Sequence, residues 1–282
     1  MARIRVLRTA KATLSRTFYL DEVGTDPTGS VGVSVNRLNG TLVESGTATA
    51  TGNPGEVTYT FGGLDVVDEL VLTWSASMGG DAVVLDSDRI EVVGGFYFGL
   101  AEGRDVDKVL KDPVKFPSAT LADVRAETED ECERITGQAW VPRFRRETLS
   151  GSGSSVLQLS NPLVRAVRSV TVAGIAWSVP AWSELGLLHY PSGWPAGHLN
   201  VVVEYEHGHD TPNTEIVRAS KQRFKSIALE GKSALPDRAE RVITVDQQGG
   251  SVVYGSPTAD KTGIPGVDAV YHRYPPPQPG FG

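Results

Sequence analysis

The sequence predicts a multidomain fold: an all-β, immunoglobulin-like sandwich over residues 1–95, an α+β domain over 96–248 with β-strands inserted between helices, and an extended C-terminal arm over 249–282 with a short docking helix. Three observations support this division. Apolar residues alternate with polar ones in the first third of the chain, helical spacing first occurs near residue 120, and glycine and proline interrupt every long element after about residue 232. The two domains therefore belong to different structural classes.

Short runs of alternating apolar residues define the predicted strands of the first domain. Turn-forming pairs such as Asn39-Gly40 separate the runs, and roughly six to eight strands at this spacing are typical of a sandwich. The Cys...Trp...Cys signature of immunoglobulin domains is absent, so the pattern predicts the architecture only. The alternating positions are Val31, Val33, Val35, Val57, Tyr59, Phe61, Leu70, Leu72, Trp74, Ile90 and Val92.

The first long helix is predicted after Pro117. Thr120 and Asp123 have the spacing of a capping box, and Gly137 supplies a left-handed stop. The apolar stripe is narrow, so we expect the helix to contact its own core along one seam and to leave its charged face free for water or a neighbouring subunit. The stripe consists of Leu121, Val124, Thr128, Cys132 and Ile135, and the charged face of Asp123, Glu127, Glu129, Asp130, Glu131, Glu133 and Arg134.

A β-element follows this helix, because Pro142 excludes the aromatic and basic run around it from the interior of a continuing helix. A second long helix is predicted from Pro212 to about Glu230, capped by Asp210 or Thr211 and ended by Gly231. The predicted strands are 144–149, 157–159, 166–172 and 199–205, and a short helix over 105–110 precedes the main one.

The order of these segments resembles that of a known family. Gly137 is followed by Gln-Ala-Trp-Val-Pro-Arg-Phe, and the strand before the second helix ends in Tyr205-Glu206-His207-Gly208. In this order, over roughly residues 99–274, the chain resembles the head-to-tail adaptor (connector) proteins of long-tailed bacteriophages that infect actinobacteria. The resemblance implies a structural virion protein of the neck. Such a protein forms a dodecameric ring beneath the portal protein, extends the DNA channel, and joins the capsid to the head-tail stopper, or next connector protein, and the tail.

The composition limits the classes of partner. With 27 basic and 34 acidic side chains the formal charge is -7, so the chain as a whole lacks the basic surface that binding to phosphates requires. We therefore expect double-stranded DNA to pass through a ring lumen without specific binding. No apolar run is long enough for a membrane span and the basic start has no signal-peptide core, so we expect synthesis in the host cytosol. Cys132 is expected to be a buried apolar residue.

Charged residues of the first helix and of the strand after it are candidate contacts with a neighbouring subunit or with DNA in the channel. Arg143, Arg145 and Arg146 form the strongest basic cluster. They either approach DNA or pair with the acidic face of the first helix, in the same or a neighbouring subunit, and the net acidity favours pairing. Glu127 and Glu131 are the acidic candidates.

A short helix is predicted near the C-terminus, after a tether at 249–263 that is rich in glycine and small polar residues. Its apolar stripe is too brief to stand alone in water, so we expect it to dock in a groove of the portal protein or the adjoining subunit. Residues 265–282 should then be removable without unfolding. The alternative is that the helix packs on its own domain. The stripe consists of Val267, Val270, Tyr271 and Tyr274, with Arg273 beside it.

The oligomeric state in solution is predicted from the charged face of the first helix. Charged rims associate weakly until another surface templates them. We therefore expect a monomer or weak oligomer that becomes a ring only on the portal.

Two clusters have the composition of a metal site. His207, His209 and Asp210 lie at a strand end, where the two histidines diverge unless the loop turns. Asp86 and Asp88 have the composition of half a calcium site, but a turn leading into the last strand explains them more simply. No Gly-x-Ser-x-Gly elbow occurs and no triad can be assigned by sequence order. We expect no catalytic residue, no metal and no cofactor, and we do not expect an enzyme.

A second function class remains open: a module whose sandwich binds carbohydrate or a cell-surface ligand. Such a module needs a cleft with several exposed aromatic side chains. The aromatic residues of the first domain mostly alternate as core residues should, which counts against this class. They are Phe18, Tyr19, Tyr59, Phe61 and Trp74.

Overall fold

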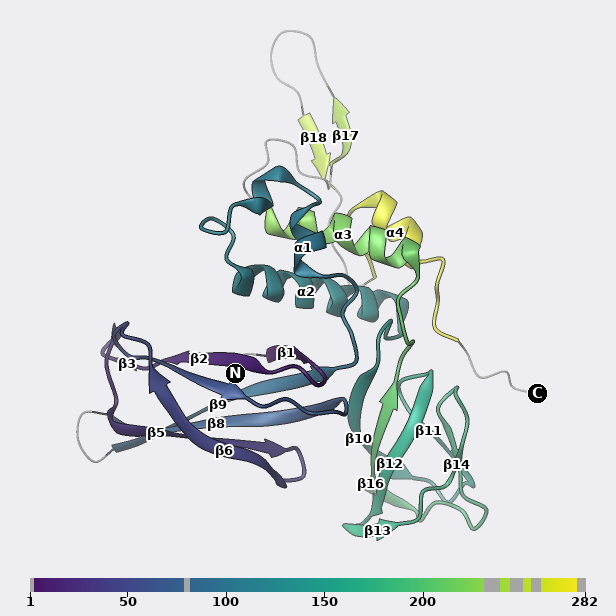
Figure 1. Cartoon of the computed structure of the whole chain (residues 1–282). Coiled ribbons are helices and arrows are strands. Elements are labelled where there is room, and N and C mark those ends of the chain that lie inside the picture. Colours follow the sequence, from purple (N-terminus) through teal and green to yellow (C-terminus); the bar gives the residue numbers. More distant parts are fainter. Residues whose placement is uncertain (1–2, 79–81, 231–238, 244–250, 255–259, 278–282) are drawn as a thin grey trace.

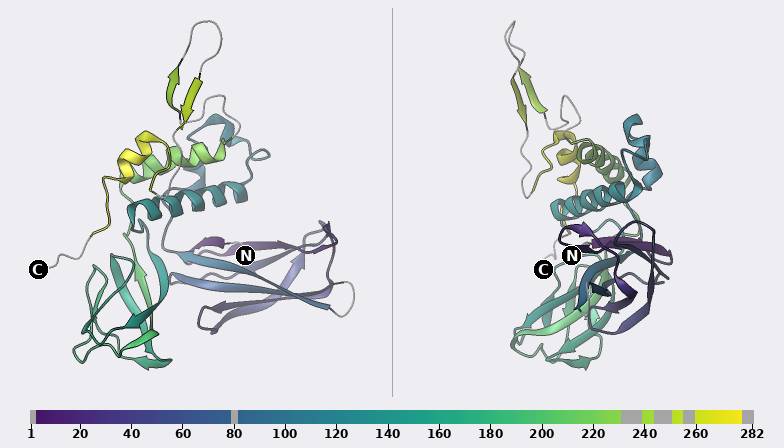
Figure 2. Two further views of the ribbon diagram at one scale, coloured as in Figure 1. Left: turned by 180° about the vertical axis from the view of Figure 1, so that it is seen from behind. Right: turned by 90° about the vertical axis from the view of Figure 1, so that its left-hand side faces the viewer.

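The computed structural model describes residues 3–78, 82–230, 239–243, 251–254 and 260–277. It is rich in β-structure and has few helices. Figure 1 shows a layer of helices above two β units: the N-terminal β unit, residues 3–93, and the second β unit, residues 143–207. Figure 2 shows the same arrangement from behind and from the side.

The N-terminal β unit is built from seven strands in the order β1-β9-β8-β5-β6-β7-β2. Strand β1 runs parallel to β9, and β6 pairs with β5 over its first part and with β7 over its last two residues. The sheet thereby folds over one core. The strands are β1 (Arg3–Leu7), β2 (Ala12–Thr17), β5 (Thr28–Arg37), β6 (Leu42–Ala50), β7 (Glu56–Phe61), β8 (Asp68–Met78) and β9 (Ala82–Val93), with a separate small hairpin of β3 (Tyr19–Leu20) and β4 (Val23–Gly24).

The predicted alternation in this unit is confirmed. Every alternating position named above is buried, and Leu70, Leu72 and Trp74 are fully inaccessible. The core takes residues from both ends of the strand order, including Leu14 of β2 and Ile90 of β9. The finer assignment to the immunoglobulin type, and the boundary near residue 95, stay predictions.

The helical layer contains α1 (Leu100–Arg104), a 3-10 turn (Lys108–Lys111), α2 (Ser118–Thr136), α3 (Thr214–Ala228) and α4 (Pro265–Tyr271). Helix α2 begins directly after Pro117, and no side chain caps it, so the capping box predicted at Thr120 is wrong and the N-cap lies three residues earlier. Its left-handed stop at Gly137 is confirmed, with φ 64°.

Helix α3 is capped by Asn213, whose side chain accepts from the backbone N–H of Glu215. The single short helix predicted at 105–110 is replaced by α1 and the 3-10 turn.

The second β unit has a sheet in the order β10-β16-β12-β13 and a smaller sheet in the order β11-β15-β14. The four predicted strands are present. Their bounds are β10 (Arg143–Gly151), β11 (Val156–Gln158), β12 (Val164–Val172) and β16 (Gly197–His207), and the additional strands are β13 (Ile175–Trp177), β14 (Ala181–Trp182) and β15 (Leu187–His189). Trp194 and Tyr205 are buried in the core of this unit.

A two-stranded hairpin of β17 (Ala239–Ile243) and β18 (Ser251–Tyr254) stands out from the helical layer (Figures 1 and 2). The predicted tether at 249–263 is therefore partly a strand, and its residues 249–250 and 255–259 lie outside the described residues. The predicted helix stop at Gly231 also lies outside them.

The N-terminal β unit contacts the second β unit where β8 and β9 meet β10. Gly94 N–H donates to the Pro142 carbonyl at 2.9 Å, and a Cβ at residue 94 would lie 2.5 Å from the Pro142 side chain. Since only glycine allows this approach, residue 94 brings the end of β9 against the start of β10.

Candidate functional site: a buried charge network on helix α2

Two glutamates of α2 and the first arginine of β10 form the centre of a buried charge network. Glu129 and Glu133 lie one turn apart on the same face of the helix. Arg143 Nη2 donates to Glu129 Oε2 at 3.0 Å and to Glu133 Oε1 at 2.8 Å. Arg143 is 2% exposed and Glu129 is 0% exposed, so these two pair out of contact with water, whereas Glu133 is half-buried at the edge of the network.

Strand β1 of the N-terminal β unit completes the network. Parallel pairing of β1 with β9 places Arg5 opposite Glu91. Arg5 Nε donates to Glu91 Oε2 at 2.7 Å, and its Nη1 donates to Glu129 Oε2 at 3.1 Å and to the Ala126 carbonyl at 2.9 Å. Arg5 also pairs with Asp130. One arginine of β1 thus contacts a carboxylate of β9 and two carboxylates of α2.

Burial and pairing act in opposite directions on the acids of this network. Burial opposes ionisation of Glu91, but Arg143 and Arg5 together outweigh it and lower the pKa of Glu91 to about 2. At Glu133 burial is the larger effect, and the pKa is raised despite the contact with Arg143. Nη1 of Arg143 has no hydrogen-bond partner among the described residues. Removing one member would leave another charge buried and unpaired, at a cost of several kcal/mol.

This network joins all three parts of the structure: β1 and β9 of the N-terminal β unit, α2 of the helical layer, and β10 of the second β unit. The segment between β9 and α1 is included, because the Tyr97 N–H donates to Glu129 Oε1 at 2.9 Å. The prediction that the charged face of α2 is free is therefore wrong for Glu129, Asp130 and Glu133. The N-terminal β unit covers that part of the helix.

The other face of α2 packs on α3 and α4. Leu121 and Cys132 are fully buried in one core with Phe224 of α3. Burial raises the pKa of the Cys132 thiol, and its buried, apolar role is as predicted. At the edge of this face Glu131 accepts from Arg223 Nε of α3 at 2.5 Å. Glu131, predicted to contact a neighbouring subunit, is thus paired within its own chain.

The three arginines of β10 have three different environments. Arg143 pairs with the acidic face of the first helix, which is the favoured alternative, and the partner helix is that of the same chain. Arg146 donates to Glu204 of β16 at 3.1 Å and is half-buried. Arg145 is exposed, as is Glu127 on α2. These two are the predicted subunit or channel contacts that remain accessible.

Helix α4 packs in a groove of its own chain, which corrects the predicted docking geometry. Val267 and Tyr271 are 0% exposed, and Tyr271 Oη lies 3.1 Å from Ser220 Oγ on α3. Val270 is half-buried against the same core. The expectation of an external groove for this stripe is wrong because α2 and α3 supply the apolar surface that the short helix requires. The alternative, packing on its own domain, is what the structure shows.

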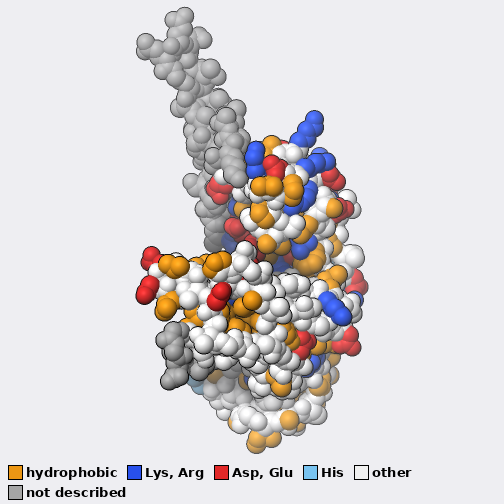
Figure 3. Space-filling model, turned by 60° about the vertical axis from the view of Figure 1, so that its left-hand side comes forward, with side chains coloured by type: hydrophobic (Ala, Val, Ile, Leu, Met, Phe, Trp, Pro, Cys, Tyr) orange, Lys and Arg blue, Asp and Glu red, His pale blue; other side chains and the backbone are white. Residues whose placement is uncertain are grey.

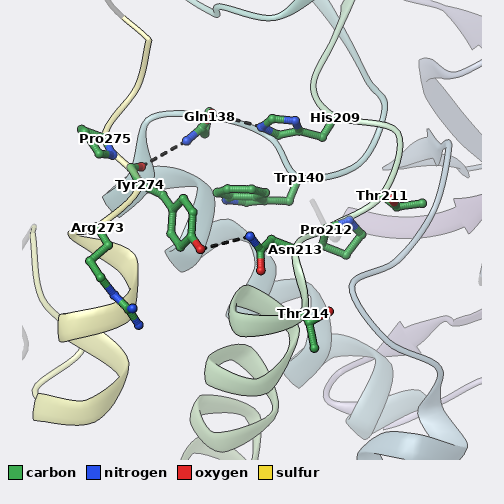
Figure 4. A pocket seen from close by; sticks show the side chains of 10 residues that line it. All are labelled: Gln138, Trp140, His209, Thr211, Pro212, Asn213, Thr214, Arg273, Tyr274 and Pro275. Carbon is green, nitrogen blue, oxygen red and sulfur yellow. Dashed lines mark hydrogen bonds between the residues drawn. The ribbon is translucent and has the colours of Figure 1, made fainter.

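The end of α4 borders an open cavity of about 670 Å³ (Figure 4). Trp140 stacks on His209 with ring centroids 4.6 Å apart, and meets Tyr274 edge-on at 5.4 Å. Gln138 Nε2 donates to the Tyr274 carbonyl at 3.1 Å, and its Oε1 lies 3.2 Å from His209 Nε2. The side chains that line the cavity therefore fix one another and hold the end of α4.

Arg273 and Tyr274, the remaining members of the predicted docking set, both contact Glu215 at the start of α3. Arg273 Nη2 lies 3.2 Å from Glu215 Oε2, and Tyr274 Oη donates to the same oxygen at 3.0 Å. Arg273 is exposed and Tyr274 half-buried. Both residues are used within the chain, at the rim of the cavity.

The histidine and aspartate cluster does not converge on one point. His207 is 5% exposed, and burial, followed by Arg143 and Arg145, lowers its pKa to about 3. His209 contacts Gln138, and Asp210 pairs with Arg165 at 2.5 Å. Within the ranges that the structure describes, no group of three or more His, Cys, Asp or Glu side chains is placed to hold a metal ion.

The second metal alternative has another explanation, since Asp86 and Asp88 both pair with Arg16. No helix in the described part of the chain is both long and apolar enough to cross a membrane.

Sequence reasoning missed Arg5 and Glu91. The only signal is their position in alternating strands: Ile90 and Val92 face the core, so Glu91 must point to the opposite side of the sheet. Nothing in that pattern indicates that a helix from later in the chain covers this side.

No family model matches the chain, and no curated protein matches it. Among solved structures, a chain in the neck of an empty gene transfer agent (GTA) particle is 14% identical with a TM-score of 0.41, over 66% of this chain and 93% of that one. A chain in the virion of a native GTA particle is 16% identical with a TM-score of 0.41 and the same coverage. CopC from Methylosinus trichosporium OB3b is 20% identical with a TM-score of 0.27, over 33% of this chain and 84% of that one. At these scores the likeness establishes neither a shared fold nor a shared function.

Proposed function

We propose that this chain is a structural protein of the neck of a tailed phage or related particle. In this role it is a head-to-tail adaptor whose copies form a ring beneath the portal protein, extend the DNA channel and carry the next connector and the tail. The proposal starts from the resemblance over residues 99–274. The segments on which the resemblance rests are neighbours in the structure. Helices α2 and α3 share one core, and β10 pairs with β16 up to its end at His207.

The observation that carries the proposal is the charge network on α2. An adaptor ring must hold its shape while DNA is packaged and while the tail is attached, so each subunit has to behave as one body. Arg5, Arg143 and Glu129 join the N-terminal β unit, the helical layer and the second β unit through contacts that are buried and directional. A sandwich mounted on a flexible linker would not need such a junction.

The exposure of the aromatic residues argues against the carbohydrate-binding alternative. Phe18, Tyr59, Phe61 and Trp74 are all buried, whereas Tyr19 is 65% exposed. A sugar platform needs several exposed aromatic rings on one surface. Of these five aromatic residues in the described part of the N-terminal β unit, Tyr19 alone has an exposed ring.

The charge of the chain suits a channel through which DNA slides. The formal charge is -7, so a ring of such chains would bind phosphate weakly, whereas a strongly basic lumen would add affinity through counterion release. The accessible Arg145 is the residue through which the second β unit would approach DNA or a partner. Twelve copies per ring follow from the resemblance alone.

The proposal is tested in the particle whose genome carries this gene. We expect a deletion to leave DNA-filled heads without tails, and an affinity tag on the chain to be found by electron microscopy at the junction of head and tail in complemented particles. Complementation with the unmodified gene is the control. Tailed, infectious particles in the deletion strain, or a tag located elsewhere, would show that the chain is not the adaptor.

A further inference from the structure

The hairpin of β3 and β4 displays an apolar and acidic surface at its tip. Tyr19 and Val23 are each 65% exposed, and Leu20 is 45% exposed. Asp21 and Glu22 lie between them, are exposed, and form no ion pair within the described chain. Exposed apolar side chains that cluster in this way mark an interaction surface more often than isolated ones do. We call residues 19–23 the knob.

The knob is held in a fixed shape. Asp21 and Glu22 have φ angles of 51° and 65°, a left-handed conformation that costs a residue with a side chain roughly 1–2 kcal/mol. The base is clamped as well: the Phe18 N–H donates to the Gly55 carbonyl at 2.9 Å, and the Gly55 N–H donates to Asp26 Oδ1 at 2.6 Å. Positive φ at both central residues is the geometry of a two-residue hairpin turn, so the turn itself fixes the shape of the knob before any partner binds.

A groove of complementary character lies between α3 and the segment after α1. It has a volume of about 450 Å³, and its lining includes Val106 and Val217 together with the side chains of Arg218, Lys221 and Lys225. Both valines are half-buried, so part of each lines the groove.

The rim of this groove carries more cations than anions. Lys221 pairs with Glu102 at 3.5 Å and Lys225 with Asp107 at 3.1 Å. Arg218 is exposed and has no charged partner among the described residues. The groove thus offers apolar surface next to an uncompensated positive charge, which complements the apolar residues and two carboxylates of the knob.

Figure 3 shows the two kinds of surface in one view. Hydrophobic and acidic side chains gather on a protrusion at the left, and Lys and Arg side chains gather well away from it on the upper part of the molecule. The knob and the α3 groove of one chain lie apart in this structure, so the knob does not occupy the groove of its own chain. Two different, complementary surfaces on one chain are the requirement for head-to-tail association, which closes into a ring when the rotation between copies allows it.

We infer that the knob of one copy docks in the α3 groove of the next copy. The inference rests on the proposed ring and names the contact between its subunits. Tyr19, Leu20 or Val23 would lie against Val106 and Val217, and Asp21 or Glu22 would pair with Arg218. The contact is small and its charges are exposed, so it is weak in solution and becomes stable when many copies are held side by side.

The contact is tested by cysteine cross-linking of the full-length protein. Equal amounts of Glu22→Cys and Arg218→Cys chains are mixed and oxidised; the native Cys132 is fully buried and does not compete. We expect a disulfide-linked dimer at several times the yield of a control mixture of Thr47→Cys with Arg218→Cys, since Thr47 is exposed elsewhere on the same β unit. Equal yields in the two mixtures would overturn the inference.

A charge exchange gives an independent test. Glu22→Arg and Arg218→Glu should each weaken self-association by about fivefold in sedimentation equilibrium, the size of an exposed ion pair, and the double variant should recover most of the loss. A double variant as weak as the singles would contradict the contact. Both assays use purified protein, so they report on this contact whether or not the chain is found at the neck. A chain at the neck without the cross-link would leave the adaptor proposal standing and remove this one.

Discussion

The two faces of helix α2 are packed by different forces. Toward α3 and α4 the contact is apolar, with Leu121 and Cys132 buried against Phe224. Toward the N-terminal β unit and β10 the contact is made by ions, with Glu129 surrounded by Arg5 and Arg143. Apolar contact is non-directional and tolerates small displacements, whereas a buried ion pair requires fixed positions. The apolar face therefore stabilises the helical layer, and the charged face sets the orientation of the β units around it.

The largest loss of stability should follow from removing an arginine that pairs with the charged face of α2. Arg143→Leu leaves the buried Glu129 with Arg5 as its remaining counter-charge and deprives the half-buried Glu133 of Arg143. It should lower the free energy of unfolding by about 3–5 kcal/mol. Arg145→Leu, two residues along the same strand but exposed, is the matched control and should change it by less than about 0.5 kcal/mol. Urea unfolding of both variants measures the difference. Equal, small losses would mean that the ion network does not hold the junction.

The apolar face should lose somewhat less when Tyr271→Ala empties the site beneath α4. Truncating a buried aromatic side chain normally costs about 3–5 kcal/mol. Here we expect about 2–4 kcal/mol, because α4 has seven residues and the loss cannot exceed the free energy of docking it. Tyr271→Phe keeps the ring and removes the hydroxyl, which contacts Ser220 at 3.1 Å and the Cys132 thiol, and should cost about 1 kcal/mol.

Hydrogen exchange locates the loss caused by Tyr271→Ala. Amides of α4 should exchange faster, while those of β8 keep their protection. Removal of residues 265–282 should likewise destabilise the helical layer and not leave it unchanged. An unaltered unfolding curve for Tyr271→Ala would show that the helix is not docked as described.

Acid should distinguish the faces, because the charged face titrates and the apolar face does not. His207, beside Arg143, has its pKa lowered from 6.5 to about 3, chiefly by burial. Between those values the unfolded chain binds a proton that the folded chain does not, so stability falls as the pH falls, by about 1.4 kcal/mol per pH unit. Glu91, with its pKa lowered from 4.5 to about 2, adds a loss of the same sign below pH 4.5.

The measurement compares the free energy of unfolding at pH 7 and pH 5. The native protein should lose about 2 kcal/mol through His207 over this interval, and His207→Gln should remove most of that slope, whatever its effect at pH 7. His198→Gln, which replaces an exposed histidine, should leave the slope unchanged. If His207→Gln keeps the native slope, His207 is not held neutral by its surroundings.

The difference between the faces also explains what could be predicted from the sequence. Apolar periodicity is local, so the strand core at Leu70, Leu72 and Trp74 and the helix stop at Gly137 were found. Of the two counter-charges of Glu129, Arg143 is 14 residues away, and the sequence favours its pairing with this helix. Arg5 is 124 residues away, and no local pattern links it to Glu129, so the sequence does not predict that the N-terminal β unit covers the charged face.

The C-terminal helix illustrates a related limit. Its stripe predicted correctly that Val267 and Tyr271 need a groove, but amphipathic spacing does not say which molecule supplies it. The strands β13, β14 and β15 are not predicted from the sequence; each has two or three residues, a length at which alternation is a weak signal, and of the strands this short in the second β unit only β11 is predicted.

The smallest effect is expected at Glu127, which lies on α2 outside both contacts. Its side chain is exposed, and it was predicted from the sequence as a subunit or channel contact. Glu127→Ala removes a solvated charge and introduces the best helix former, so the free energy of unfolding should stay within about 0.5 kcal/mol of the native value. In the structure the charge network on α2 consists of the side chains that contact Arg5 or Arg143, and Glu127 is not one of them. A loss above about 1 kcal/mol would show that the network extends further around the helix. Sedimentation of the same variant separates the two roles of an exposed carboxylate: unchanged stability with weakened self-association would make Glu127 part of an interface between copies, and no change in either would make it an ordinary solvated residue.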